Sequence, residues 1–402
     1  MTDHFEYDVA IVGGGPAGSS TALHLVRKEG ISPRRIVVLD KAKFPRDKPC
    51  AGAVSQLGVD VLAALGIQVT VPSVTMTGVR VLAGETIGET IGHMGIVIRR
   101  TEFDSQLLET ARRDGVDVRD GEGLSAIERK GGHRGGFVLT TTSGSKIATR
   151  FVVAADGAGS TTRKLLGIRE QARKGHLYVL DTEPLACDEG VTRGLVDFDL
   201  SIVDDGLEGY YWDFPTVIDG ARQVSRGIYH VNLSRPDAPS GESVKDVLAR
   251  SLARRGIDIA TVKLRPFSTR PFVARSIGWR PGIVLVGEAF GIDRTTGEGI
   301  AQALEMGRMA ASHLAVAVRT GHPRFEAYER DVRTSTTGRH FLQSAWLAQR
   351  VYSRTGYPAR RYLLRSSYGR TAAIKWYRGD PLPLLTQLRL GFGLAASAFG
   401  SA

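Results

Sequence analysis

Short apolar runs recur along the first three hundred residues and predict buried strands. They lie at residues 8–12, 35–39, 151–155 and 282–286 and are rich in valine, isoleucine and alanine. Runs without polar alternation are typical of strands that are covered on both faces of a parallel sheet. Helical spacing of apolar residues follows the first run from Ser19 onward. The pattern therefore predicts an α/β unit in which strands and helices alternate.

The turn after the first strand carries glycines with the spacing GxGxxG. Gly13, Gly15 and Gly18 stand between strand and helix, and Asp40 ends the second strand 22 residues later, close to the roughly 20 expected. The first glycine allows the tight turn, the second lets a pyrophosphate approach, and the third lets helix pack on strand. Asp40 offers a carboxylate to ribose hydroxyls. This stretch predicts a dinucleotide site at the positive end of a helix.

A different pattern, with more alternation of polar and apolar residues, predicts antiparallel strands in the middle of the chain. The strands are expected at residues 177–185, 195–203, 209–214 and 223–233, and a helix follows at residues 243–255. A period of two is typical of a sheet with one buried face. We therefore expect a second domain built on one sheet.

The two patterns together predict how the chain is divided. The first domain is expected to be discontinuous, residues 1–175 and 276–331, because a buried strand returns after residue 275. Residues 176–275 form the expected inserted substrate domain, and residues 332–402 form a basic helical C-terminal region. The predicted fold class is α/β, with a Rossmann-type dinucleotide-binding domain, an inserted antiparallel-sheet domain and C-terminal helices.

Composition restricts the class of protein. The 402 residues are 42% hydrophobic and 24% charged, which is ordinary for a soluble globular chain. The two cysteines, Cys50 and Cys187, suggest no disulfide framework, and no metal-ligand spacing is apparent. No apolar run reaches the length of about 18 residues that a spanning helix needs, and the polar N-terminus does not resemble a signal peptide. We expect a cytoplasmic protein.

The net charge of +11 is concentrated in the C-terminal region. Residues 332–402 hold eleven lysines and arginines and one acid, Asp380, and end in a leucine-rich segment at residues 382–394. No nucleic-acid-binding motif accompanies the charge, so we expect no nucleic acid partner. Two arrangements are open. Either the helices lie on an anionic membrane surface as a peripheral contact, or they pack on the body of the protein.

Three separated motifs resemble one group of flavoproteins. They are GGGPAG at residues 13–18, AADGAGS at residues 154–160 and GEAFGIDRTTGEGI at residues 287–300. In this order they are similar to motifs of the FAD-dependent oxidoreductases of the para-hydroxybenzoate hydroxylase structural group, which includes aromatic hydroxylases, flavin halogenases and geranylgeranyl reductases. The resemblance implies FAD as cofactor. It also implies NAD(P)H as a transient electron donor, or a partner in its place, since no second GxGxxG is present.

The resemblance also implies which residues hold FAD. They are the glycines and acids of the motifs and two arginines: Gly13, Gly15, Gly18, Asp40, Arg100, Asp156, Gly157, Glu288, Arg294, Gly297 and Gly299. Two of them depart from the group's pattern. Glu288 stands where an aspartate is usual, and Arg294 stands where a proline is often found near the flavin. Arg294 either stabilises an anionic reduced flavin by its charge or points to solvent.

Two further segments resemble the geranylgeranyl reductase branch of the group. Residues 48–53, KPCAGA, are similar to its PCGGG-type loop, and residues 209–215, GYYWDFP, are similar to its YxWxFP motif. On a strand, Tyr210, Trp212 and Phe214 share one face. They either form a wall for a lipophilic or aromatic substrate or fill a core.

The candidate catalytic residues are Cys50, Tyr210 and Trp212. Cys50 either faces the flavin and donates a proton to the substrate, or is a buried small hydrophobe. Halogenation is disfavoured, because Tyr210 and Phe214 stand where the halogenases need a tryptophan-type motif.

Three functions follow from these patterns. The first is an FAD-dependent oxidoreductase that reduces a double bond of an isoprenoid or other lipophilic substrate. The second is an FAD-dependent monooxygenase of the aromatic hydroxylase type that modifies a natural product. The third is a non-catalytic binding protein that retains the flavin fold, which Glu288 and Arg294 leave open.

Overall fold

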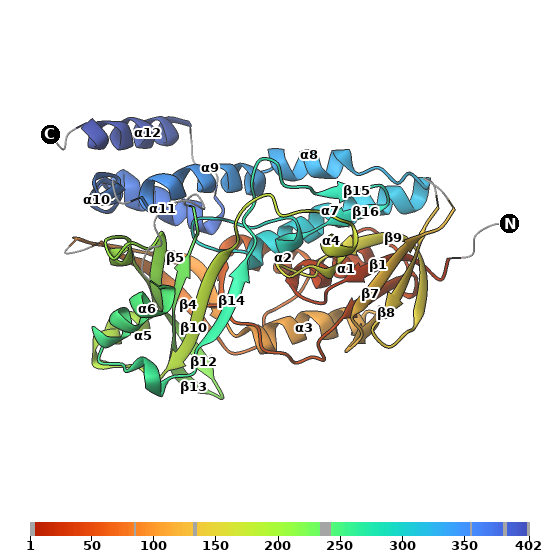
Figure 1. Cartoon of the computed structure of the whole chain (residues 1–402), viewed down its shortest axis with the longest axis horizontal. Helices are drawn as coiled ribbons and strands as arrows, with labels where there is room; N and C mark the ends of the chain where they lie inside the picture. The colour runs from red at the N-terminus through yellow and green to blue at the C-terminus, as the bar shows by residue number, and fades with distance from the viewer. Residues whose placement is uncertain are drawn as a thin grey trace.

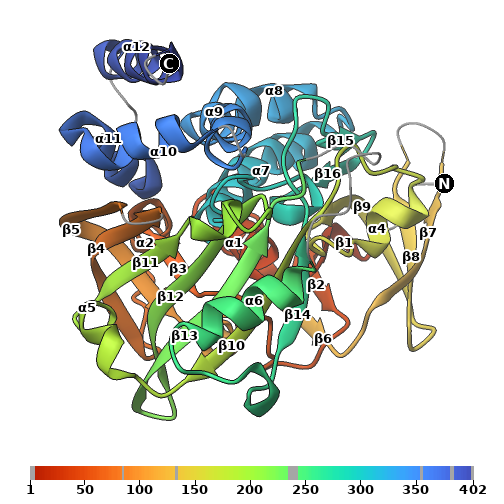
Figure 2. The same ribbon diagram turned by 60° about the vertical axis from the view of Figure 1, so that its left-hand side comes forward.

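The structure, a computed structural model, describes residues 5–83, 86–131, 135–233, 243–353, 356–380 and 384–399. Two eight-stranded sheets make up the body, and the helices of the C-terminal part gather along one side of them (Figures 1 and 2). The predicted α/β class, with a Rossmann-type domain, a second sheet and C-terminal helices, is confirmed.

The first sheet, sheet A, is the dinucleotide-binding sheet. Its main path runs β15-β16-β9-β1-β2-β6, and the β7–β8 hairpin joins it through β9. All pairings among β16, β9, β1, β2 and β6 are parallel. The strands are β1 Tyr7–Val12, β2 Ile36–Asp40, β6 Asp117–Asp120, β7 Leu124–Arg129, β8 Phe137–Thr141, β9 Lys146–Ala154, β15 Trp279–Arg280 and β16 Ile283–Leu285.

The alternation of side chains along β1 divides the core around sheet A. Val9 and Ile11 pack in the cluster that includes helices α1 Pro16–Arg27, α3 Arg100–Arg113 and α7 Ile300–Thr320. Ala10 and Val12 face the other way, into the cluster that includes β7 and β8. Both faces of β1 are therefore buried, as its uninterrupted apolar run predicts.

The second sheet, sheet B, runs β14-β10-β13-β12-β11-β4-β5-β3. Its pairings are antiparallel except β4 with β11, which is parallel. The strands are β3 Ala53–Ser55, β4 Ser73–Ala83, β5 Thr86–Ile98, β10 Gly175–Thr182, β11 Leu195–Asp199, β12 Gly209–Ile218, β13 Ala221–His230 and β14 Arg265–Thr269.

The strands of sheet B come from a longer part of the chain than the predicted substrate domain. Residues 53–98 were expected in the first domain, but the structure places β3, β4 and β5 in the same sheet as residues 175–269. Residues 75–98 of this segment are rich in valine, isoleucine and threonine, which favour strands. This composition carries no signal for the partner strand, because β4 pairs with β11 across more than a hundred residues.

The two faces of sheet B have different neighbours. Tyr210, Trp212 and Phe214 lie in one cluster with side chains of the C-terminal helices, whereas Tyr211 lies in the cluster with α6 Val244–Ala253. The remaining short helices are α2 Gln56–Ala64, α4 Thr161–Leu165 and α5 Glu189–Thr192, with 3-10 turns at Pro33–Arg35, Ala186–Asp188, Ser201–Val203, Ile259–Thr261 and Gly287–Ala289.

In the described part of the chain, five helices follow α7, and all but the first begin within the predicted C-terminal region of residues 332–402. They are α8 Glu326–Thr334, α9 Thr336–Val351, α10 Tyr357–Arg365, α11 Ser367–Arg378 and α12 Leu384–Phe399. Phe341 of α9 is fully buried in the main core, and Ala348 belongs to the second cluster. Helix α12 contacts α10 and α11 and lies on their far side from the sheets (Figures 1 and 2). Among the described residues, no helix combines the length and apolarity that a bilayer span requires.

Candidate active site

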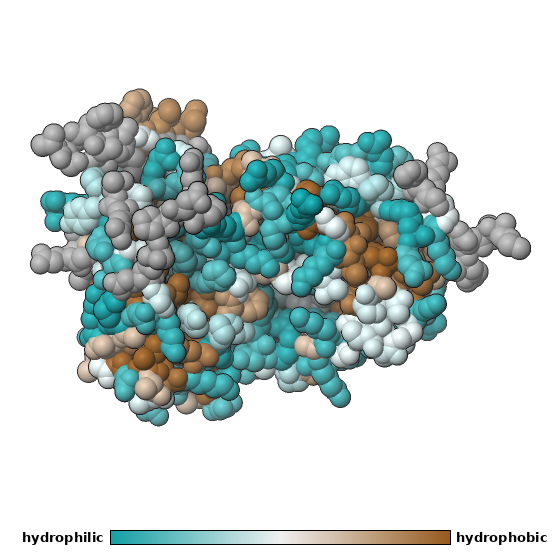
Figure 3. All heavy atoms as spheres, in the orientation of Figure 1, coloured by the Kyte–Doolittle hydropathy of each residue, from teal (hydrophilic) through white to brown (hydrophobic). Residues whose placement is uncertain are grey.

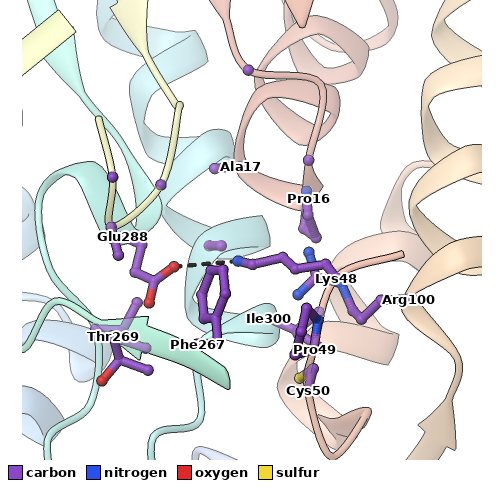
Figure 4. Close-up of a pocket in the computed structure, with 18 of the residues that line it drawn as sticks. Pro16, Ala17, Lys48, Pro49, Cys50, Arg100, Phe267, Thr269, Glu288 and Ile300 are labelled. Carbon is purple, nitrogen blue, oxygen red and sulfur yellow. Dashed lines mark hydrogen bonds and ion pairs between the residues drawn. The ribbon is translucent and has the colours of Figure 1, made fainter. Parts of the chain in front are cut away.

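A cavity of about 580 Å³ lies where sheet A, sheet B and α7 meet. Most of the predicted site residues line it: Gly13, Gly15, Asp40, Cys50, Arg100, Asp156, Gly157, Tyr210, Trp212, Glu288, Gly297 and Gly299. Gly18 and Arg294 are not part of its lining. Residues that are far apart in the chain, such as Pro16, Cys50, Phe267 and Glu288, surround the same space (Figure 4).

The three glycines of the first turn meet different surroundings. At Gly13, where φ is +112°, a Cβ would overlap the backbone of Ala155, and at Gly18 it would overlap the backbone oxygen of Gly13. At Gly15 the nearest described atom would be Nη2 of Arg46, 3.4 Å away. Gly13 and Gly18 thus serve the turn and the helix packing, while Gly15 leaves space beside the N-terminus of α1.

Asp40 ties the end of β2 to the glycine turn. One carboxylate oxygen, Oδ2, accepts the backbone N–H of Gly14 at 2.8 Å, and Oδ1 accepts that of Ala42 at 2.8 Å. These bonds hold the carboxylate at the cavity edge. The oxygens retain further lone pairs for ribose hydroxyls.

Arg46 is a cavity residue that the sequence reasoning missed. Its Nη2 pairs with Asp104 at 3.0 Å, and its guanidinium lies 4.7 Å from the centroid of the Phe44 ring. The buried Nη1 has no hydrogen-bond partner among the described residues. An unpaired buried donor is costly unless a ligand satisfies it, so Arg46 beside Gly15 fits an anionic group such as a pyrophosphate. The only signal in the sequence is a basic residue in the loop after Asp40.

Arg100 is held rigidly on the cavity wall. It is buried, and Nε and Nη2 donate to the two oxygens of Asp104, each at 2.7 Å. Burial alone favours the neutral form of Arg100, but the ion pair with Asp104 outweighs it and raises the pKa. The Cys50 thiol lies beside this guanidinium and accepts the N–H of Gly52 at 3.4 Å. The structure therefore places Cys50 next to a permanent positive charge.

An ion pair links two walls of the cavity. Lys48 Nζ lies 3.3 Å from Oε2 of Glu288 and 4.8 Å from the centroid of the Phe267 ring (Figure 4). Glu288 therefore keeps a carboxylate at the place predicted for the third motif. Lys48 neutralises it from the loop that carries Cys50.

The second and third motifs are joined by an arginine that the sequence did not single out. Arg270 Nη1 donates to the backbone oxygens of Gly157 and Glu288, both at 3.1 Å. The carboxylate of Asp156 is turned to α4, where Oδ1 accepts the hydroxyl of Ser160 at 2.6 Å and Oδ2 accepts the N–H of Thr162 at 2.8 Å. Asp156 thus shapes the turn with its side chain.

An aromatic wall closes the other part of the cavity. Tyr210, Trp212 and Phe214 line it together with Phe198, whose ring centroid lies 5.0 Å from that of Tyr210 and 5.2 Å from that of Phe214. Tyr377 of α11 lines the same space and was not predicted, because its element is about 160 residues away from β12 in the chain. The motif at residues 209–215 therefore forms a wall and not only a core.

Glu298 is another residue of the cavity lining that the sequence analysis did not single out, and its side chain is ionisable. Its Oε1 accepts the N–H groups of Ala301 at 3.3 Å and Ser55 at 3.5 Å, and no described group pairs with the buried Oε2. Burial raises the pKa of Glu298 to about 8, and nearby Asp293 adds to the shift. Burial in the cavity wall therefore favours the neutral carboxylic acid form of Glu298 near pH 7. In the sequence, Glu298 is one residue of the third motif, and nothing there marks it as a buried acid.

Arg294 is hydrogen-bonded to the segment that follows β13. Its Nη2 donates to the backbone oxygen of Asn232 at 3.2 Å, and burial lowers its pKa. The residue is absent from the cavity lining. A contact between Arg294 and the flavin remains a prediction.

The site combines two compartments in one cavity. The glycine turn, Asp40 and Arg46 provide hydrogen-bond donors and acceptors for a dinucleotide, with the space at Gly15 for its pyrophosphate. The aromatic wall provides an apolar compartment beyond it. This arrangement is that of a dinucleotide-dependent oxidoreductase, in which the glycine turn, Asp40 and Arg46 would hold the cofactor beside the apolar compartment.

Comparison with known proteins identifies the family. The family model described as "FAD binding domain" matches residues 6–335, and the chain belongs to this family. The protein is an FAD-dependent oxidoreductase, which confirms the predicted cofactor and the resemblance to the para-hydroxybenzoate hydroxylase group.

Three individual proteins are similar to this chain over most of its length, at low sequence identity. A menaquinone reductase of Mycobacterium tuberculosis is 28% identical over 333 residues, with 76% of each chain covered. A geranylgeranyl diphosphate reductase of Rhodobacter capsulatus is 28% identical over 335 residues, covering 79% of this chain and 77% of that protein. The solved structure of a geranylgeranyl bacteriochlorophyll reductase-like protein of Thermoplasma acidophilum has a TM-score of 0.72 with 20% identity, covering 92% of this chain and 96% of that one. This structural likeness shows the shared fold.

Proposed function

We propose that this enzyme reduces a carbon–carbon double bond, or a quinone, in a lipophilic substrate of isoprenoid character. The observation that carries the proposal is the aromatic wall of Phe198, Tyr210, Trp212 and Phe214, which continues the dinucleotide site within one cavity. An apolar compartment of this kind favours a lipophilic substrate. The names of the two reductases similar to this chain support the same substrate class.

The chain's own residues have distinct tasks in this reaction. Reduced FAD, when bound, would supply a hydride, and reduction of the substrate also requires one proton. Cys50, beside the Arg100 guanidinium, is the proposed holder of that proton at Sγ. Tyr210 and Trp212 orient the substrate and exclude water. NAD(P)H is the proposed transient donor that restores the reduced cofactor.

An anaerobic experiment tests the function. The purified flavin-loaded enzyme is reduced with NADPH or dithionite and then mixed with a menaquinone or a geranylgeranyl compound. We expect the flavin absorbance to return in proportion to the substrate, with a product two hydrogens richer. Consumption of oxygen in proportion to an aromatic substrate, with no anaerobic turnover, would instead establish the monooxygenase.

We also propose that the C-terminal region makes a peripheral contact with an anionic membrane. Helix α12 exposes large apolar side chains: Leu384 at 70%, Leu385 at 60%, Leu388 at 50% and Phe392 at 74%. Hydrophobic atoms are visible at the upper left of Figure 3, where α12 lies in the same orientation in Figure 1. Several exposed basic residues lie on the same helical region: Arg339, Arg350, Arg361, Arg365, Lys375 and Arg389.

Not every residue of the C-terminal region that was proposed to meet the membrane is accessible. Arg360 is buried and donates to the backbone of Val351 and to Asp204, so it is unavailable to lipid. Leu382, Arg354 and the side chain of Leu394 belong to the predicted segment but lie outside the described residues. Tyr377 of α11 lines the cavity, and α12 contacts α11. A membrane in contact with α12 would therefore lie next to a helix that forms part of the wall of the apolar compartment.

Vesicle sedimentation tests this contact. Flavin-loaded protein is mixed with vesicles of neutral or anionic lipid at low and high salt. We expect binding to anionic vesicles that falls with salt, about 1 kcal/mol being contributed by each basic residue near the surface, and that is lost in the double variant Leu385→Ser/Phe392→Ser. Val316→Ser, which alters an exposed residue of α7, is the matched control. Equal sedimentation of both variants would contradict a role of α12.

A further inference from the structure

The loop at residues 293–296 is held by an unusual number of buried hydrogen bonds. Asp293 is fully buried, and its carboxylate accepts the backbone N–H groups of Thr295 at 3.1 Å and Thr296 at 2.8 Å. It also accepts the hydroxyls of Thr296 and Ser344. The residues that follow, from Thr296 to Gly299, line the cavity. The loop is therefore a wall of the FAD site that the protein itself keeps in place.

Three successive carbonyls of this loop each accept a tyrosine hydroxyl. The oxygen of Arg294 accepts from Tyr229 at 3.4 Å, and that of Thr296 accepts from Tyr210. The oxygen of Thr295 accepts from Tyr352 at 2.7 Å. Because each peptide unit is planar, a fixed carbonyl also fixes the following N–H group. The hydroxyls and Asp293 therefore determine the orientation of consecutive peptide planes.

Many of these contacts come from α9 and its C-terminal end. Ser344 Oγ accepts the N–H groups of Arg294 at 3.2 Å and Thr295 at 3.0 Å, and the hydroxyl of Thr295 donates to the backbone oxygen of Ser344 at 2.7 Å. Tyr352 caps the same helix. Both residues lie beyond residue 335, where the match to the family model ends.

We propose that Ser344 and Tyr352 are positioning residues of the FAD site, acting through the loop at residues 293–299. The C-terminal region is then a part of the cofactor site and sets the environment of the bound flavin. Neither side chain needs to touch the cofactor. The inference depends on bound FAD and is independent of the substrate proposed above.

The chain offers matched controls for both residues. Tyr328 of α8 is also buried, and its hydroxyl donates to the backbone oxygen of Leu285 at 2.9 Å, away from the loop. Ser251 of α6 is buried and donates to the backbone oxygen of Val247 at 3.0 Å. Tyr352→Phe and Tyr328→Phe therefore remove the same kind of bond from different places. Ser251→Ala controls for the loss of a buried serine hydroxyl, while Ser344→Ala removes more bonds, because Ser344 Oγ contacts Arg294, Thr295 and Asp293.

The readouts are the dissociation constant of FAD, the visible spectrum of bound FAD and its reduction potential, together with the thermal midpoint of each variant. We expect Tyr352→Phe to weaken FAD binding about tenfold, the worth of one buried hydrogen bond. Ser344→Ala removes several bonds and should weaken it at least as much, and both variants should shift the spectrum and the potential. Tyr328→Phe and Ser251→Ala should lower the thermal midpoint without changing the flavin properties.

Equal flavin affinity, spectrum and potential in all four variants would overturn the proposal and leave Ser344 and Tyr352 with a purely structural role. A loss confined to the thermal midpoint would have the same meaning. If Ser344→Ala does not fold, Tyr352→Phe decides alone, because it removes a single oxygen atom and leaves the ring in its packing.

Discussion

Gly13, Gly15 and Gly18 belong to one motif but are required for different reasons. A side chain at Gly13 or Gly18 would collide with the backbone of the turn itself, whereas Gly15 has space around it and an ordinary φ of −73°. The sequence predicted this division from the spacing alone, since the roles of the three positions follow from the geometry of a strand–turn–helix. It could not predict Arg46 beside them, because the distance between that loop and the turn is set by the tertiary fold.

The variant Gly15→Val is expected to fold but to lose FAD, because the valine side chain would occupy the space left for the pyrophosphate. The free energy of unfolding of the apoprotein should fall by only about 1 kcal/mol, as for an unfavourable N-cap residue. Absorbance of the purified protein measures the flavin content, and circular dichroism measures the fold. Gly391→Val, at a glycine where a Cβ would meet no described atom within 4 Å, is the control. A folded Gly15→Val protein with its full flavin content would falsify this assignment.

Glu298 gives the stability of the protein a predictable dependence on pH. Its pKa is about 8 in the folded state, against an ordinary value of 4.5 for a glutamate in water. Between these values the folded state binds more protons than the unfolded state, so the contribution of Glu298 to stability falls as pH rises and is fully lost above pH 8. Glu298→Gln carries no ionisable group and should escape this loss.

The measurement compares thermal or denaturant unfolding of Glu298→Gln and the parent protein from pH 5 to pH 8. The difference in unfolding free energy should grow in favour of the variant with pH, by up to about 1.4 kcal/mol per pH unit. A difference that stays constant over this range would show that Glu298 ionises normally.

Strand β12 shows what a period of two can and cannot predict. The alternation correctly placed Tyr210, Trp212 and Phe214 on one face, and the structure has Tyr211 on the other. It did not reveal that Tyr377 of α11 would face the same cavity, nor that β4 would be the parallel neighbour of β11. Local periodicity determines which side chains share a face, whereas the partner of an element depends on contacts between distant segments.

A substitution of Trp212 tests whether the aromatic side chains of β12 contact the substrate. Trp212→Ala should weaken substrate binding by roughly tenfold or more, as expected for the loss of a large apolar contact, while FAD remains bound. The substrate dissociation constant and the flavin content are the two measurements. Trp279→Ala, which removes the same side chain at an edge strand outside the cavity lining, is the control. Loss of FAD together with substrate would show that Trp212 supports the fold and not the substrate compartment.

At the scale of the whole molecule, the C-terminal helices divide into an integral and a separable part. Helices α8, α9 and α11 bury Tyr328, Phe341, Ala348 and Ile374, whereas the described apolar side chains of α12 include four that are at least half exposed. The sequence predicted helices and basic charge here but left open whether they pack on the body. Composition could not decide this, because the same leucines and aromatics suit a core or a membrane surface.

Two truncated chains test whether α12 is separable from the body while α9 is an integral part of it. A chain that ends at residue 380 should keep its FAD and its thermal midpoint within a few degrees, because it loses only α12 and the residues beyond it. A chain that ends at residue 335 should aggregate or purify without flavin, because it lacks the buried side chains of α9 and the bonds from Ser344 and Tyr352 to the FAD loop. Flavin content and light scattering measure both outcomes. Full flavin in the shorter chain would contradict the integral role of α9.

The parallel pairing of β4 with β11 also has a consequence for synthesis of the protein. Strand β11 follows β4 by more than a hundred residues, and all of β6 to β9, which belong to the other sheet, are made in between. At about 5–20 residues per second, a nascent chain presents the unpaired edge of β4 for roughly 6–22 seconds. An open strand edge is a template for association with other chains. We therefore expect the yield of this protein in a cell to depend on what shields that edge on the ribosome as well as on the stability of the finished molecule.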